Sequence, residues 1–233
     1  MPETQELETK QGFKKTKLGW IPMDWELKKF SAIANISMGQ SPKGNTYNGE
    51  GIGIPLINGP TEFTERYPIK KQWTSTPTKI CNKGDILICV RGSSTGRINI
   101  SNDNYCIGRG IAAIKATDKT DQNYIESQLL FAVDRILKLT SGSTFPNISS
   151  TDLKNIDVLI PNLIEQKAIA NCLSTWDTAI TKLDALIQAK QQLKKALMQQ
   201  MLSGKKRLPG FDEEWEEKRL DYFFNERSER NNE

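Results

Sequence analysis

The chain has 233 residues, of which 37% are hydrophobic, and it carries a net charge of +4. This length suffices for one large domain or two small ones. The chain contains no apolar run of bilayer length and no positively charged N-terminal segment followed by an apolar stretch. We therefore expect a cytoplasmic protein without a membrane partner. Histidine is absent, as are GxxxxGK[ST] and GxGxxG phosphate-binding motifs, so the sequence does not suggest catalysis.

The N-terminal two thirds of the chain alternate between short apolar runs and polar loops. Residues 1–17 are polar without periodicity, which predicts a flexible leader. From Trp20 to Pro161 the apolar runs are broken by Gly, Pro, Asn and Ser, and three of them predict strands: "GIPLING" (53–59), "GDILICVRG" (84–92) and "CIGRGIAAIKA" (106–116). One helix is predicted over 121–139, with Asp121 as its cap. These elements indicate a mixed α+β domain.

A long helix is predicted over residues 162–204. Asn162 followed by Glu165 is typical of a helix start, and Gly204 before three basic residues is typical of a stop. About 40 residues without proline or glycine would form about 60 Å of helix. Apolar residues recur along it at alternating spacings of four and three, as in a coiled coil. We call these residues the seam: Ile169, Leu173, Trp176, Ile180, Leu183 and Ile187.

Beyond Ile187 the apolar stripe drifts, with Lys190 and Lys194 at positions where a strict heptad wants apolar residues. An amphipathic helix lying on its own domain is the alternative reading of this pattern. A helix of about 60 Å is longer than the diameter of a domain of about 140 residues, which is about 30 to 35 Å. We therefore expect part of the seam to need a partner from elsewhere.

The end of the chain looks like its beginning. "LPGFDEEWEEKRL" (208–220) can be laid over "LGWIPMDWELKKF" (18–30) at an offset of 190 residues, which places Trp215 on Trp25. The match is either chance or the start of a second repeat that breaks off, and the second reading assigns residues 205–233 to an incomplete repeat.

Charge and cysteines narrow the list of partners. Residues 212–233 carry nine acids and four bases, a net charge of −5, which leaves +9 on residues 1–211. A basic body favours an acidic partner, most commonly nucleic acid, although a merely solvated basic surface is the alternative. The cysteines form no CxxC pair, so a zinc site would need all four together. We interpret them as reduced, mostly buried thiols and expect no metal: Cys81, Cys89, Cys106 and Cys172.

Four segments, in this order and spacing, carry a resemblance to a known family. They are "GDILICVRGSSTGRINI", "CIGRGIAAIKA", "SGSTFPNISSTDLKNIDVLIP" and the helix that opens with "LIEQKAIANCL". Over residues 18–210 the chain resembles the specificity subunit of type I restriction-modification systems, in a half-length form with one target-recognition domain. The resemblance implies a domain for DNA recognition at 18–161 and a helical spacer, the conserved region of the family, at 162–204.

The resemblance also implies a function and its partners. Such a subunit is not an enzyme. It binds double-stranded DNA and docks methyltransferase subunits, which carry the S-adenosylmethionine chemistry, and through them a restriction subunit. With one domain and one spacer, this chain is expected to recover the missing half from a second copy, pairing helices antiparallel and reading an interrupted palindrome. The alternatives are pairing with a different half-subunit, or a stand-alone DNA-modifying enzyme.

Polar loops of the recognition domain supply the residues that would contact DNA. Base readout needs side chains with hydrogen-bonding edges, and other groups fix the phosphates. The same residue types are also ordinary turn formers, so either role is open. The candidates are Lys43, Asn45, Thr46, Tyr47, Lys70, Lys71, Arg91, Ser93, Ser94, Thr95, Arg97, Ser143, Thr144 and Asn147.

Overall fold

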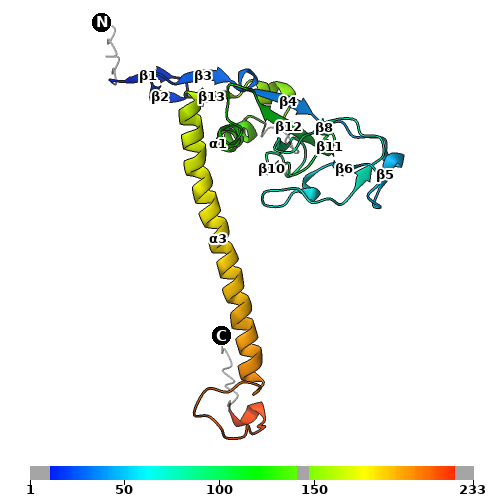
Figure 1. Cartoon of the computed structure of the whole chain (residues 1–233), viewed down its shortest axis with the longest axis vertical. Helices are drawn as coiled ribbons and strands as arrows, with labels where there is room; N and C mark the ends of the chain where they lie inside the picture. Colours follow the sequence, from blue (N-terminus) through cyan, green and yellow to red (C-terminus); the bar gives the residue numbers. More distant parts are fainter. Residues whose placement is uncertain (1–10, 141–146, 224–233) are drawn as a thin grey trace, which may run out of the picture. The chain divides into compact units, whose positions relative to one another are not determined.

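A computed structural model describes residues 11–140 and 147–223 of the chain (Figure 1). The chain divides into two compact units, residues 1–175 and residues 176–233. The first unit has mixed sheets with helices, which confirms the predicted α+β class. None of the helices in the described ranges is long and apolar enough to cross a membrane.

The first described element is a β-hairpin within the predicted leader. Strand β1 (Phe13–Thr16) pairs antiparallel with β2 (Gly19–Pro22), and Gly19 takes a φ of +105° at the turn. The prediction of a flexible leader up to residue 17 is therefore wrong for residues 13–16. The cause is that this strand is mostly polar and none of its residues is fully buried. It is held by backbone pairing with β2 and shows no apolar alternation for a sequence pattern to detect.

A two-stranded sheet joins distant parts of the first unit. Strand β3 (Glu26–Lys29) pairs antiparallel with β13 (Asp157–Ile160). After β3 the chain turns through a 3-10 helix, η1 (Phe30–Ala32), where the fully buried Phe30 donates its N–H to the carbonyl of Ile156 at 2.8 Å.

Two larger sheets form the body of the first unit (Figure 1). The four-stranded sheet is antiparallel throughout, in the spatial order β10 (Ile98–Ile100), β9 (Ile86–Cys89), β12 (Ile111–Ala116) and β4 (Ala34–Met38). The five-stranded sheet is mixed, with β6 and β11 parallel, in the order β5 (Tyr47–Asn48), β7 (Trp73–Thr74), β6 (Ile54–Ile57), β11 (Tyr105–Ile107) and β8 (Ile80–Cys81).

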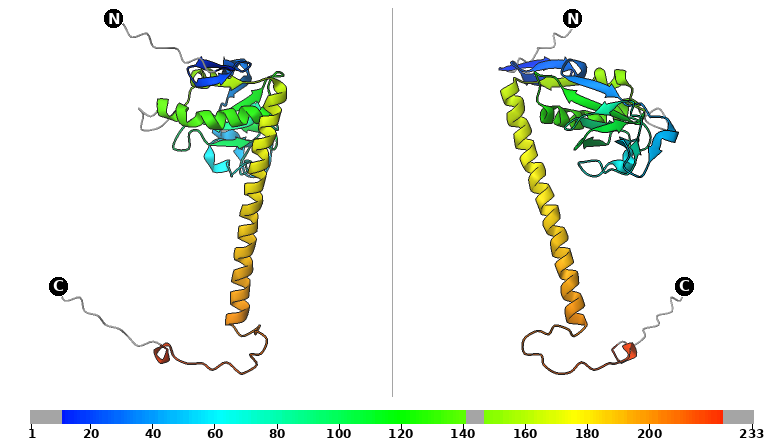
Figure 2. Two further views of the ribbon diagram at one scale, coloured as in Figure 1. Left: turned by 90° about the vertical axis from the view of Figure 1, so that its left-hand side faces the viewer. Right: turned by 45° about the vertical axis from the view of Figure 1, so that its right-hand side comes forward.

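Strand β9 lies at the centre of the core, because both of its faces are buried. Ile86 and Ile88 pack in one apolar cluster with helix α1 (Gln122–Thr140), whereas Leu87 and Cys89 pack in a second cluster with the five-stranded sheet. Figure 2 shows α1 as a green helix beside the sheets. Double burial explains why "ILIC" reads as a continuous apolar run rather than an alternating one. All three predicted strand regions contain strands in the structure.

Helix α1 confirms the prediction over 121–139, and Asp121 caps it by accepting the N–H of Tyr124 at 3.0 Å. A short helix that the sequence reading missed, α2 (Ser150–Lys154), begins with a capping box between Ser149 and Asp152.

The long helix α3 runs from Leu163 to Leu202, within two residues of the predicted bounds. Asn162 accepts the N–H of Glu165 at 3.0 Å, and Gly204 follows the last turn with a φ of +73°. The first turns belong to the first unit, where Gln166 is almost fully buried and its side chain bonds both Asp121 and Pro161.

Candidate nucleic-acid interface

The turn between β9 and β10 carries five of the predicted DNA-binding residues. Gly92 and Gly96 both have positive φ, and the N–H of Gly96 returns to the carbonyl of Cys89, which closes the turn. Arg91 and Ser93 are exposed and Ser94 is half-buried, whereas Thr95 is buried and donates its hydroxyl to the Gly92 carbonyl at 2.6 Å. The turn therefore presents Arg91 and Ser93 outward, with Thr95 supporting it from inside.

Arg97 lies at the end of the same turn, but its guanidinium holds another loop. It donates to the carbonyls of Phe63 and Thr64 at 3.1 and 3.2 Å. The neighbouring Asn99, which is almost fully buried, also bonds Thr64 through both ends of its amide. In this arrangement Arg97 fastens the loop after η3 (Pro60–Glu62) to the sheet through Nη2. Its side chain is exposed, and its contact with DNA stays a prediction.

The predicted lysines divide in a similar way. Lys70 forms an ion pair with Asp103 at 2.6 Å, which raises the pKa of Lys70, and Lys71 donates to the Thr61 carbonyl at 2.7 Å. Lys43 instead is exposed just before the 3-10 helix η2 (Gly44–Thr46). The structure thus fixes Lys70 and Lys71 to neighbouring loops.

The other candidates near η2 are partly structural. Asn45 is exposed, but Thr46 bonds the Lys43 carbonyl at 2.7 Å and the Thr74 hydroxyl at 2.9 Å. Tyr47 is half-buried, and its hydroxyl donates to the Pro42 carbonyl at 3.2 Å. Only Lys43 and Asn45 of this group present their side chains to the exterior.

The structure brings Arg91 together with Asn147 through an isolated antiparallel bridge. These two residues are 56 positions apart, so the pairing was not accessible from sequence spacing. Ser143 and Thr144, predicted in the same loop as Asn147, lie outside the described residues.

Sequence reasoning missed one exposed cation beside this point. Arg109 lies between two glycines in the turn from β11 to β12. This turn adjoins the segment that carries Arg91, because the N–H of Val90 bonds the carbonyl of Gly110. The signal was the "GRG" inside "CIGRGIAAIKA", which we interpreted only as strand.

Three of the four cysteines are buried in the first unit. Cys81, Cys89 and Cys106 are buried, as expected for most of the four, and Cys172 is exposed. Burial raises the pKa of Cys89 to about 12, so this thiol stays neutral.

The seam of α3 is mostly uncovered in the single chain. Its members from Leu173 to Ile187 are between 44% and 66% exposed, whereas Ile169 packs against the core of the first unit. Further along, in the second unit, Leu193, Leu197 and Leu202 line a shallow groove with Met198 and Met201. Apolar side chains exposed in such a continuous row are typical of an association surface.

The tail repeats the local structure of the N-terminal copy. A 3-10 helix, η4 (Leu220–Tyr222), stands 190 residues after η1, the same offset as the sequence match. The ion pair between Lys28 and Glu26 at 2.6 Å returns as Lys218 and Glu216 at 2.9 Å. The self-match therefore includes the 3-10 helix and the ion pair, but not the strand, because residues 216–219 form no strand.

Comparison with known proteins identifies the class of this chain. The family model for the type I restriction modification DNA specificity domain matches residues 22–195. A putative type I restriction enzyme MjaX specificity subunit from Methanocaldococcus jannaschii is 37% identical over 201 residues, which is 85% of this chain and 47% of that protein. The MjaIX specificity subunit of the same organism is 29% identical, over 72% of this chain and 41% of that protein.

A solved structure agrees with these matches. The HsdS subunit from Thermoanaerobacter tengcongensis superposes with a TM-score of 0.65 at 29% identity, over 81% of this chain and 47% of the other. The chain belongs to the family of type I restriction-modification DNA specificity domains. Specificity subunits are non-catalytic, and catalysis lies in their partner subunits. The chain spans about half the length of the curated relatives it matches.

Proposed function

We propose that the chain recognises one DNA half-site for a type I restriction-modification complex and docks the methyltransferase subunits, and through them the restriction subunit. The observation that carries this proposal is the family match, which runs through the recognition fold and most of α3. The exposed arginine-bearing turns of the first unit and its basic charge suit a phosphate-rich partner.

We further propose that two copies pair through the seam, with their helices antiparallel. A two-fold dimer requires the seam to be self-complementary, so that each contact occurs twice. Ile180 and Leu183 flank a point between residues 181 and 182, one residue from the midpoint of α3. Rotation about that point sets Ile180 against Leu183 of the second copy and Ile187 against Trp176 of the second copy, which gives four central apolar layers.

The lysines that interrupt the seam are compatible with this register. The same rotation places Lys190 opposite Leu173 of the second copy. A lysine can lay its methylene stem over an apolar side chain while its ammonium group reaches water. Lys190 and Lys194 are therefore tolerated at the ends of the paired region, where the side chains are closer to solvent.

Mass measurement and methylation mapping test the proposal together. The free chain should have the mass of a dimer, and the complex with its methyltransferase should modify a palindrome interrupted by a fixed spacer. A monomer with an asymmetric two-part target would show that the second half comes from a different protein. Transfer of a labelled methyl group from S-adenosylmethionine by the chain alone would contradict the non-catalytic role.

Charge placed in the seam tests the helix pairing directly. In Ile180→Glu/Leu183→Glu, four glutamates would meet at the centre of the dimer, so we expect loss of self-association while the first unit stays folded. Gln188→Glu is the matched control, because it adds charge to the same helix beside the seam. Light scattering measures the mass and circular dichroism the folding. A double variant with the wild-type mass would mean that the seam does not pair.

A further inference from the structure

The turn that carries Arg109 is fixed by three different segments of the first unit. Its backbone N–H groups donate to the Ile57 carbonyl from Gly108, at 2.8 Å, and to the Ser41 hydroxyl from Arg109, at 3.1 Å. The carbonyl of Gly110 accepts the N–H of Val90 at 2.8 Å. The backbone on both sides of Arg109 is thus held in one position.

Close packing adds to this constraint. A Cβ atom at Gly108 would lie 2.1 Å from Oδ1 of Asn58, and one at Gly110 would lie 2.7 Å from the carbonyl oxygen of the same residue. At Gly110 this distance is far below van der Waals contact with backbone, so the position requires glycine, whereas a side chain at Gly108 would force the Asn58 side chain to move. Arg109 is the one side chain that projects from this three-residue turn.

The side chain of Arg109 itself is uncommitted. It is exposed, and within the described ranges no hydrogen bond or ion pair is found for its guanidinium or for that of the exposed Arg91. By contrast, Arg97, Lys70 and Lys71 bond neighbouring loops. Arg109 and Arg91 therefore form a pair of available cations at the end of one strand pair.

We propose that Arg109 is a specificity-determining residue that reads a guanine in the DNA half-site, with Arg91 supplying positive charge beside it. This inference rests on the proposed function. A guanidinium recognises guanine by two parallel hydrogen bonds to O6 and N7, which demands accurate placement of the side chain. A turn already locked in the free protein supplies that placement without an ordering cost on binding.

The charge-conserving variant distinguishes base reading from a simple phosphate contact. Lysine keeps the charge but lacks the planar fork, so Arg109→Lys would retain a phosphate contact and lose the bidentate one. The full chain, assembled with its methyltransferase subunits, is used to select duplexes from a random pool. Arg109→Lys, Arg109→Ala and the control Lys119→Ala are then titrated against the selected duplex and a random duplex at two salt concentrations.

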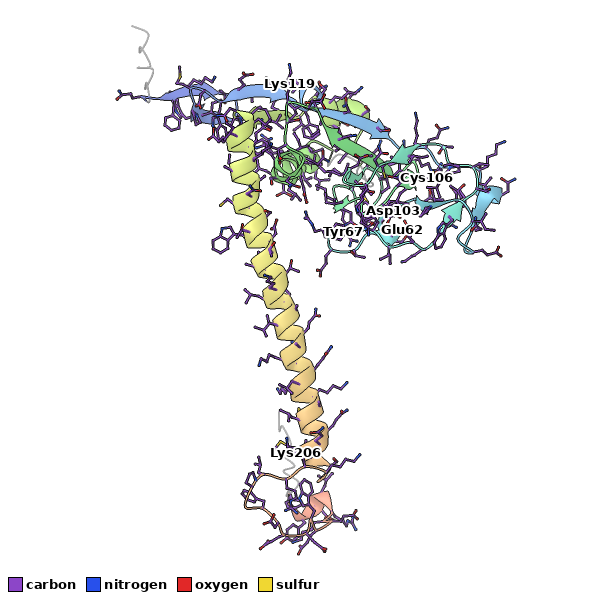
Figure 3. The ribbon with its side chains drawn as sticks, viewed as in Figure 1. Glu62, Tyr67, Asp103, Cys106, Lys119 and Lys206 are labelled. Atoms are coloured by element: carbon purple, nitrogen blue, oxygen red, sulfur yellow. The ribbon has the colours of Figure 1, made fainter. Side chains whose placement is uncertain are left out.

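We expect both Arg109 variants to lose about 10–100-fold in preference for the selected duplex, and a second selection with them to relax at one guanine. Lys119→Ala should behave as wild type, because Lys119 is exposed beyond the other end of β12. Figure 3 labels it together with Cys106, whose strand leads into the Arg109 turn.

Two results would overturn the inference, and they are distinguishable. If the wild-type complex selects a sequence and Arg109→Lys binds it equally well, Arg109 does not read a base. If the wild-type complex selects no sequence, the proposed function itself fails. Circular dichroism of each variant confirms that the first unit remains folded.

Discussion

Residues 25–32 and 215–222 are two versions of one motif in different surroundings. Both contain a Glu–Lys ion pair and a 3-10 helix at the same relative positions. In the first version β3 pairs with β13 and Phe30 is fully buried, whereas the residue equivalent to Phe30 in the second version, Leu220, is 76% exposed.

This difference separates the structure that residues close in sequence can form by themselves from the structure that needs packing against a core. The ion pair and the 3-10 helix need only residues within four positions of one another, so they form in both versions. Strand pairing needs β13, which lies more than 100 residues from β3 in sequence, and burial needs the apolar cluster, which gathers residues from many segments of the first unit. The following substitutions test this separation in decreasing order of expected effect.

The largest difference is expected between Phe30→Ala and Leu220→Ala. Phe30→Ala removes a fully buried ring and leaves a cavity, so it should lower the free energy of unfolding by about 3–5 kcal/mol. Leu220→Ala changes an exposed side chain and should stay within about 0.5 kcal/mol of wild type. Urea unfolding followed by circular dichroism measures both. Equal losses would show that the tail packs as the first version does.

A smaller difference is expected between the two tryptophans. The indole N–H of Trp25 donates to the Glu165 carboxylate at 3.2 Å, which ties β3 to the start of α3. Trp25→Phe removes that bond and should cost about 1 kcal/mol. Trp215 is 58% exposed and its ring lies below the Arg207 guanidinium, so Trp215→Phe should change little. Thermal unfolding of the two variants in one buffer makes the comparison, and a larger shift for Trp215→Phe would contradict it.

The smallest difference concerns the cation just before each 3-10 helix, which is Lys29 in the first version and Arg219 in the second. Lys29 bonds Asp157 on β13 at 3.0 Å, whereas the equivalent Arg219 forms an ion pair with the nearby Asp221, at 3.4 Å. Burial opposes ionisation of Asp157, but Lys17 and Lys29 together hold its pKa below the usual range. Asp157→Asn should therefore cost about 0.5–1 kcal/mol, because such partly exposed pairs are screened by water.

The effect of Asp157→Asn on the free energy of unfolding should depend on pH. A lowered pKa in the folded state stabilises the protein above the ordinary aspartate pKa of about 4, and the stabilisation is lost as the pH falls through the folded value. The deficit of Asp157→Asn should thus be present at neutral pH and shrink on acidification. Asp221→Asn serves as the control and should show no deficit at neutral pH. Urea unfolding at a series of pH values measures both variants.

Sequence patterns determined the elements whose signal is local or periodic. The bounds of α3 followed from its caps and the absence of proline and glycine between them. Asp121 marked the start of α1, because its side chain caps that helix. The apolar run of β9 indicated a buried strand, and the repeat of Trp25 at Trp215 was visible by inspection. The family, too, could be inferred from four short segments, because their order and spacing are specific.

Only the tertiary structure decided which polar residues are available to a partner. Arg97 and Arg109 look alike in sequence, each beside a glycine in a basic loop. The Arg97 guanidinium donates hydrogen bonds to carbonyls 33 and 34 residues away in sequence. The backbone of the Arg109 turn is held by Asn58 and Ser41 from two other segments, which leaves the Arg109 side chain exposed. The hairpin strand β1 was likewise set by hydrogen bonds rather than by apolar pattern. Such contacts depend on which distant segments the fold brings together, and a pattern of neighbours in sequence does not contain that information.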